Sequence, residues 1–320
     1  MLSRRLYNWL FYGHIWIALA ATGLSWLSLR ITYGYQNCVS ESPILSFIFF
    51  STLGIYTLHR YLSFQRAGER PTTRRYEIVR QHPRTSLMVG GASALIAGVL
   101  GLRFISTIWS ALLLALPITV FYLTPPAKGW RRLRDLPYLK NLWVALAWAV
   151  MTVIVPVTIF ESEARAEGME HFCMMVSGAI YPRPLNSINL YLELAVRFLF
   201  TGCIALLFDL RDVTLDRSQG VRTIAGEYPV LHRILVYSSL VFCSVAALFQ
   251  WHFTCLTPGF GEALSVVYLL MIPLAYFTCQ KTSEDWFAVV VNGLLLLPPL
   301  VYWLADVLGA DAGAGGGLGL

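Results

Sequence analysis

Long apolar segments recur along the chain, and short polar runs rich in arginine and lysine separate them. An α-helix needs about 17–25 apolar residues to cross ~30 Å of hydrocarbon, and these segments fall in or near that range. A helix also satisfies its own backbone hydrogen bonds inside a bilayer. We therefore expect nine transmembrane helices, near residues 9–29, 43–62, 86–102, 105–123, 139–160, 189–208, 230–250, 263–280 and 285–306.

Two features refine this division of the chain. Only Leu102, Arg103 and Phe104 separate the third span from the fourth, so these two spans are expected to form a tight helical hairpin. Residues 1–308 are expected to form a single transmembrane domain, and the Gly/Ala-rich residues 309–320 a flexible tail. The fold class predicted from the pattern is an all-α polytopic membrane protein.

Composition and charge exclude a soluble protein and set an orientation. Of 320 residues, 57% are hydrophobic and 13% are charged, against roughly 25% charged in soluble domains. The net charge of +6 does not indicate nucleic acid binding, because the basic residues lie between the spans and no basic-aromatic motif accompanies them. Nineteen of the 24 basic residues fall on one side if the N-terminus is cytoplasmic. This asymmetry predicts an N-in, C-out topology.

The second and sixth spans share a weak internal similarity. Each ends in a polar run that is followed by a basic loop containing threonine. An internal similarity of this kind is typical of a duplicated architecture with a binding site between its two halves. We therefore expect two pseudo-repeats, roughly 1–123 and 139–250, followed by the last two helices.

Three acidic residues come directly after the sixth span. At 100° per residue, Asp209, Asp212 and Asp216 of a continued helix lie within about 60° of one another, and Gly220 and Thr223 would follow on the same stripe. Carboxylates on one face repel each other and favour a cation between them, and clustered oxygens suit Mg²⁺. The C-terminal end of a helix also disfavours anions. Three carboxylates at a position where local electrostatics disfavours them therefore indicate a functional site.

The alternative interpretation is a set of solvated charges neutralised by Arg211, Arg217 and Arg222, but the extended spacing DxxDxxxDxxxGxxT favours a site. The run from Phe208 to Thr223 resembles the second aspartate-rich motif of the UbiA superfamily of intramembrane prenyltransferases. The layout of the spans is also similar, over about residues 1–306.

The resemblance implies nine helices around a central cavity, with Mg²⁺ and a prenyl diphosphate bound beneath a cytoplasmic cap. It further implies transfer of a polyprenyl group from its diphosphate to a hydrophobic acceptor, through an allylic carbocation.

The resemblance also assigns roles to single residues. Asp209, Asp212 and Asp216 correspond to the catalytic acids that bind the metal. Lys128, which follows Tyr-Leu-Thr-Pro-Pro-Ala, resembles the basic residue that contacts the diphosphate. Arg70, which precedes a proline, resembles an Arg-Pro pair with the same role. Arg217 is a further expected diphosphate ligand. For Lys128 and Arg70 the alternative is a topological role as positive-inside residues.

The first aspartate-rich motif of the family, usually NDxxDxxxD, is missing. Counting back from Arg70 without gaps aligns its four acidic or amide positions with residues that carry no carboxylate: Ile55, Tyr56, His59 and Ser63. Three interpretations stay open. The chain uses one Mg²⁺, with His59 and Arg60 as the groups that bind the diphosphate in place of the other metal; it acts on an altered substrate; or it binds lipid without catalysis.

The expected partners are a polyprenyl diphosphate, a hydrophobic acceptor and the lipid bilayer, and the expected location is a bacterial cytoplasmic membrane with the site on the cytoplasmic side. A non-catalytic isoprenoid-binding or lipid-binding protein is the main alternative to an enzyme. A transporter is less favoured, because its candidate charges, Glu193 and Arg197, are spaced as a local i,i+4 helix pair.

Overall fold

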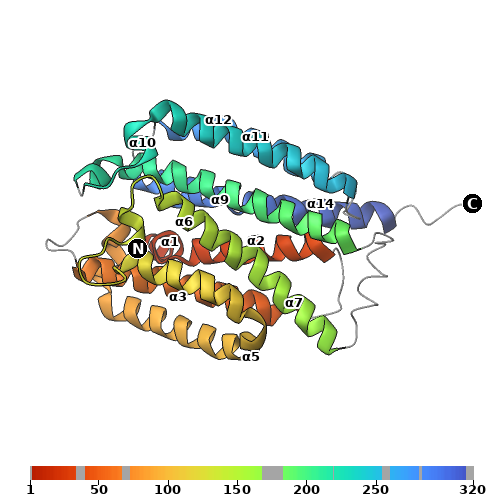
Figure 1. Ribbon diagram of the computed structural model, residues 1–320, viewed down its shortest axis with the longest axis horizontal. Helices are drawn as coiled ribbons and strands as arrows, with labels where there is room; N and C mark the ends of the chain where they lie inside the picture. Colours follow the sequence, from red (N-terminus) through yellow and green to blue (C-terminus); the bar gives the residue numbers. More distant parts are fainter. Residues whose placement is uncertain are drawn as a thin grey trace, which may run out of the picture.

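The computed structural model describes residues 2–33, 40–66, 73–167, 183–218, 220–253, 260–280 and 283–314. All regular elements in these ranges are helical, and the long helices lie side by side along one axis (Figure 1). The expected all-α polytopic fold is confirmed.

The helices are α1 Leu2–Tyr12, α2 Ile15–Tyr33, α3 Ser42–Arg66, α4 Glu77–Gln81, α5 Pro83–Leu123, α6 Lys140–Ala149, α7 Val155–Ala166, α9 Arg183–Ser218, α10 Ile224–Glu227, α11 Pro229–Phe253, α12 Phe260–Thr278, α13 Asn292–Leu294 and α14 Leu297–Ala314. Shorter elements are the 3₁₀ turns η1 Arg74–Tyr76 and η2 Leu133–Asp135 and the π-helical segments η3 Val150–Ile154 and η4 Trp286–Val291.

The number of helices differs from the nine expected. Seven helices of the described ranges are long and apolar enough to cross a membrane, or eight if the bent pair Trp286–Leu294 and Leu297–Val307 forms one span. The difference arises at α5, which is helical throughout its 41 residues and covers both segments expected as the third and fourth spans. The helical hydrogen bonding therefore continues through Leu102, Arg103 and Phe104, where the tip of the expected hairpin lies.

The contacts of α5 nevertheless require it to double back. A Cβ atom at Gly90 would lie 3.0 Å from Leu58, and one at Gly101 would lie 3.0 Å from Phe47, so the first half of α5 runs antiparallel to α3. Tyr122, near the other end of α5, lines a cavity together with residues adjacent to Leu58. The two halves of α5 consequently lie side by side, as its orange and yellow parts do in Figure 1.

Prolines explain the irregular helices. The π-helical turn η3 precedes Pro156 and joins α6 to α7 in one span, because a proline cannot donate the backbone hydrogen bond of a regular turn. Pro298 and Pro299 follow the break before α14, where the last pair of helices bends by 51°. Helix α14 extends to Ala314, so the first residues of the segment expected as a tail are helical, and residues 315–320 lie outside the described ranges.

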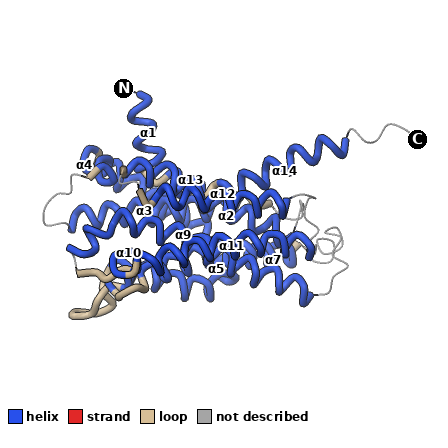
Figure 2. Tube along the Cα trace, turned by 90° about the horizontal axis from the view of Figure 1, so that it is seen from above, coloured by secondary structure: helices blue, strands red, loops and turns tan. Residues whose placement is uncertain are grey.

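The loops that carry the candidate chemistry gather at one end of the bundle, which we call the polar end (Figure 2). Helix α1 projects from the bundle at a steep angle to the long helices near this end, and its side chains bind the segment before η4 (Figure 2). The Tyr12 hydroxyl donates to the Asp285 carboxylate at 2.6 Å, and the Tyr7 hydroxyl donates to the same oxygen at 3.0 Å. Arg74, from the loop after α3, also pairs with Asp285. Through Asp285, these contacts connect the N-terminal helix with the first loop.

We expect the α3–α5 contact to be sensitive to side-chain size. A Cβ atom at Gly54 would lie 3.0 Å from the backbone nitrogen of Ala94, whereas one at Gly91 would meet nothing within 4 Å. Gly54→Leu should therefore destabilise the protein by about 1–3 kcal/mol through overpacking. Thermal unfolding in detergent micelles measures this, with Gly91→Leu on the open face of α5 as the matched control. Equal melting temperatures for the two variants would contradict the close α3–α5 approach.

Candidate functional site

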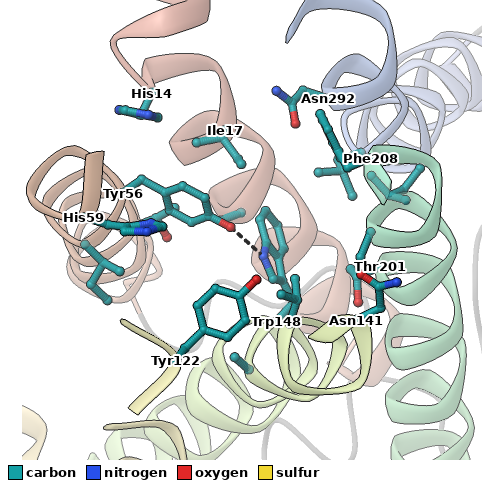
Figure 3. A pocket seen from close by; sticks show the side chains of 18 of the residues that line it. His14, Ile17, Tyr56, His59, Tyr122, Asn141, Trp148, Thr201, Phe208 and Asn292 are labelled. Atoms are coloured by element: carbon teal, nitrogen blue, oxygen red, sulfur yellow. Dashed lines mark hydrogen bonds between the residues drawn. The ribbon is translucent and has the colours of Figure 1, made fainter. Parts of the chain in front are cut away.

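A cavity of about 340 Å³ opens among α2, α3, α5, α6, α9 and the π-helical segment η4. Figure 3 shows that Tyr56 of α3, Tyr122 of α5 and Trp148 of α6 face it, with Phe208 and Thr201 of α9 on the other side. The indole nitrogen of Trp148 donates to the Tyr56 hydroxyl at 3.0 Å. The deeper part of the cavity is therefore an aromatic and apolar chamber that suits a hydrocarbon ligand.

Unsatisfied polar atoms mark the same cavity. The indole nitrogen of Trp143 and the side-chain oxygen of Asn292 are buried and have no hydrogen-bond partner within the described ranges. Both residues line the cavity. Since buried polar groups are normally hydrogen-bonded, these two atoms are available to bind polar groups of a ligand in this space.

The acidic residues lie at the polar end of the cavity. Helix α9 continues past Phe208 to Ser218, as expected, so Asp209, Asp212 and Asp216 share one helix. The expectation for the rest of the motif was wrong, because the helix ends before Gly220. Gly220 adopts a positive φ of 71° in the following turn, a conformation that glycine tolerates, and Thr223 caps α10 by accepting from the Gly226 backbone nitrogen at 3.2 Å.

Lys140, the first residue of α6, bridges two of these carboxylates. Its Nζ lies 2.9 Å from Oδ1 of Asp209 and 2.8 Å from Oδ2 of Asp216. Asn141 donates from Nδ2 to the other Asp209 oxygen at 2.6 Å. The two carboxylate side chains are only 2% exposed, so the ammonium group provides the counter-charge that burial demands.

Asp212 pairs with two arginines instead of with Lys140. Arg211 donates from Nε and Nη2 to the two Asp212 oxygens, each at 3.0 Å. Arg75, from the loop after α3, donates to Asp212 Oδ1 at 2.9 Å. The backbone nitrogen of Arg75 also donates to Glu284 at 2.9 Å. Asp212 thus links the first loop to α9.

This donor set does not fit the magnesium site expected from the sequence. All three carboxylates are already paired with lysine or arginine, and a divalent cation at the shared oxygens of Asp209 and Asp216 would be repelled by the ammonium of Lys140. Within the described ranges, no group of three or more His, Cys, Asp or Glu side chains could hold a metal ion.

The opposite wall of the cavity carries residues at the positions where the resemblance led us to expect the first acidic motif. Ile55, Tyr56 and His59 line the cavity, and so does Arg60. The guanidinium of Arg60 lies 5.1 Å from the centre of the Tyr76 ring. Within the described ranges Arg60 makes no ion pair with a carboxylate. It therefore leaves a positive charge on the cavity wall where the family pattern would have acids.

Lys128 and Arg217 were also expected to bind the diphosphate, but neither side chain lines the cavity. Lys128 is exposed in the loop after α5. Arg217 is exposed at the end of α9 and donates to the backbone oxygen of Gly226 at 3.1 Å. Arg70 lies outside the described residues. Their assignment to the diphosphate stays a prediction.

A cluster of loop residues positions Lys140 beside α9. The backbone nitrogen of Tyr138 donates to the Arg222 carbonyl at 3.0 Å, and Arg222 pairs with Glu227 at 2.7 Å. The hydrogen bond from the Tyr138 hydroxyl to Glu227 raises the pKa of Tyr138 to about 12. Hydrogen bonds, first from Arg222, lower the pKa of Glu227 to about 2. The loop before α6 is consequently fixed to the loop after α9.

Lys140 and Arg75 belong to the site, although neither was expected there from the sequence. A signal for Lys140 was present, because a lysine at the start of a helix opposes the helix dipole just as an aspartate at the end does. The start of α6 contacts the end of α9, so the lysine and the aspartate lie together and each neutralises the unfavourable charge of the other. The pairing of Arg75 depends on the fold of the first loop, which the sequence pattern does not specify.

Comparison with solved structures identifies the fold. The chain superposes on digeranylgeranylglyceryl phosphate synthase, a UbiA-family prenyltransferase, with a TM-score of 0.53 and 12% sequence identity. The match covers 96% of this chain and 99% of that one. No family model and no curated protein sequence matches. The UbiA-like fold expected from the sequence is thereby confirmed.

The bridge made by Lys140 should be essential for stability. Lys140→Met would leave two buried carboxylates without a counter-charge, at a cost of about 3–5 kcal/mol. Urea or thermal unfolding in detergent measures the loss, and Lys128→Met in the exposed loop is the matched control. Adding Asp209→Asn and Asp216→Asn to Lys140→Met should recover much of the stability. A Lys140→Met variant as stable as the control would contradict the bridge.

Proposed function

We propose that this chain is an intramembrane prenyltransferase that moves a polyprenyl group from its diphosphate to a hydrophobic acceptor. The observation that carries this proposal is Arg60, a cation without a carboxylate partner within the described ranges, at the polar end of a chamber lined by aromatic rings. An amphiphile with an anionic head and a hydrocarbon tail matches both ends. The similarity in fold to a prenyltransferase supports the same class of substrate.

The basic side chains would hold the diphosphate head. Four of them line the cavity, against two carboxylates, and they are Arg60, Arg75, Lys140 and Arg211. Guanidinium groups bind phosphate oxygens through paired, charge-assisted hydrogen bonds. The carbon–oxygen bond of the prenyl diphosphate then breaks, and the electron pair leaves with the diphosphate, whose added charge these cations stabilise.

The aromatic side chains would protect and orient the carbocation. Tyr56, Tyr122 and Trp148 line the chamber, and the faces of aromatic rings attract cations. The apolar walls exclude water, which would otherwise capture the cation. A nucleophilic atom of the acceptor forms the new bond to carbon and loses its proton to the departing diphosphate. No step runs through the magnesium ion expected from the sequence, because the aspartates are paired with basic side chains.

A second candidate function is non-catalytic binding of isoprenoid lipids. The ion pairs of Asp209, Asp212 and Asp216 favour it, because they leave these acids engaged in structural contacts. Stable binding of a prenyl diphosphate without release of diphosphate, in the presence of phenolic and glycerol-phosphate acceptors, distinguishes this function from transfer.

Removal of the Arg60 charge tests the proposed reaction. Arg60→Gln should lower kcat/KM for prenyl transfer about tenfold to a hundredfold, as expected for loss of hydrogen bonds to a charged group. The measurement is diphosphate release and prenylated product from purified protein in lipid nanodiscs, with geranylgeranyl diphosphate as donor. Arg84→Gln, an exposed position near the start of α5, is the matched control.

Absence of product with every donor and acceptor, together with unchanged donor binding in Arg60→Gln, would overturn the assignment. Donor binding that depends on Arg60 without turnover would instead establish the second candidate.

A further inference from the structure

We infer that the cavity binds the phosphate head of its ligand through the chain's own cations, with Lys140 in the position that a metal ion would occupy, and that binding needs no divalent cation. This inference rests on the proposed function for the choice of an isoprenyl diphosphate as ligand. It goes further in stating how the head is held, and it departs from the metal-dependent binding that the sequence resemblance implies.

Lys140 occupies the position between the carboxylates that a metal ion would need. Its ammonium contacts one oxygen of Asp209 and one of Asp216, at 2.9 and 2.8 Å, and Asn141 occupies the second Asp209 oxygen at 2.6 Å. These are the oxygens that a divalent cation would need. Lys140 also lines the cavity, so its ammonium is positioned to contact both the acids and an incoming anion. A metal would have to displace it from two carboxylates that are 2% exposed.

Both carboxylate oxygens of Asp212 are paired with arginine side chains. Arg211 contacts both of its oxygens, and Arg75 contacts one of them. The Arg211 and Asp212 side chains are 18% and 16% exposed, so this group of charges is largely shielded from water. Bidentate pairs of this kind are among the stronger hydrogen-bonded contacts in proteins. Asp212 consequently acts as a support that holds two guanidinium groups at the cavity, both of which line it.

The opposite wall of the cavity carries basic side chains where the resemblance implies acidic ones. His59 and Arg60 line the cavity at the level of the missing first motif. An acidic wall would need metal ions between it and a diphosphate, whereas a basic wall attracts the diphosphate directly. The absence of carboxylates on one wall and their neutralisation on the other are independent observations, and both remove the need for a metal.

Ligand binding in the presence and absence of metal tests the inference. The full-length protein in nanodiscs is titrated with geranylgeranyl diphosphate in EDTA and again in excess Mg²⁺, and the dissociation constant is measured by isothermal titration calorimetry. We expect the two constants to agree within about twofold, and Arg60→Gln to weaken binding about tenfold in both buffers. Geranylgeraniol should bind much more weakly. Inorganic diphosphate and phosphatidic acid, run in parallel, show whether an isoprenoid or a general phosphate head is recognised.

Manganese binding provides a readout that is independent of the ligand. Electron paramagnetic resonance should show no protein-bound Mn²⁺ in the wild-type chain. Lys140→Gln leaves Asp209 and Asp216 without their shared cation, so this variant should gain a Mn²⁺ signal and bind geranylgeranyl diphosphate only when a divalent cation is present. If Lys140→Gln does not fold, the wild-type comparison and Arg60→Gln still decide the question.

The possible failures are distinguishable. Binding that is lost in EDTA, or a Mn²⁺ signal from the wild-type protein, would overturn the metal-free site even if prenyl transfer is observed. Metal-independent binding without any turnover would leave this inference standing and contradict the proposed transferase. Equal affinity for geranylgeraniol and its diphosphate would overturn the head-group site itself.

Discussion

The ion bridge from Lys140 to Asp209 and Asp216 is the interaction on which the rest of the site depends. Two buried carboxylates at the end of a membrane helix are unstable by themselves, because burial and the helix dipole both oppose them. The ammonium of Lys140 is also disfavoured by itself, because the helix dipole opposes a positive charge at the start of α6. Placed in contact, these groups compensate each other and join α6 to α9 at the mouth of the cavity. The bundle can therefore carry charge here without a bound metal.

The same compensation shapes the surroundings of the cavity. With Asp209 and Asp216 satisfied by one lysine, Asp212 is available to hold Arg75 and Arg211, and thereby to connect the first loop with α9. The loops on either side of Lys140 are fixed by Tyr138 and Glu227. The outcome is a chamber whose aromatic depth suits hydrocarbon and whose entrance is lined by more basic than acidic groups. An anionic amphiphile is the ligand class that matches both regions.

Much of the fold could be predicted from the sequence, because hydrophobic length and charge asymmetry are direct consequences of the bilayer. The continuation of α9 through Asp216 followed from helical geometry. The number of separate helices could not be predicted in this way, since α5 keeps its helical hydrogen bonding through the tip of the expected hairpin. The last span also bends at its prolines.

The candidate site was predictable only in part. The aspartates could be found by their spacing, but the identity of their counter-ion could not, because contacts between Lys140 and residues about 70 positions away depend on how α6 and α9 pack. Gly220 and Thr223 belonged to a recognisable pattern yet form a turn and a cap instead of a helix face. Basic residues in loops, such as Lys128 and Arg217, carry the same sequence signal whether they bind a ligand or only set topology.

An experimental structure with a non-hydrolysable geranylgeranyl diphosphate analogue, grown in excess Mn²⁺, tests the central claim most directly. We predict anomalous scattering at background level beside Asp209 and Asp216, with Lys140 still bridging them and the diphosphate in contact with Arg60. A strong manganese peak between the two aspartates, with Lys140 displaced, would contradict it.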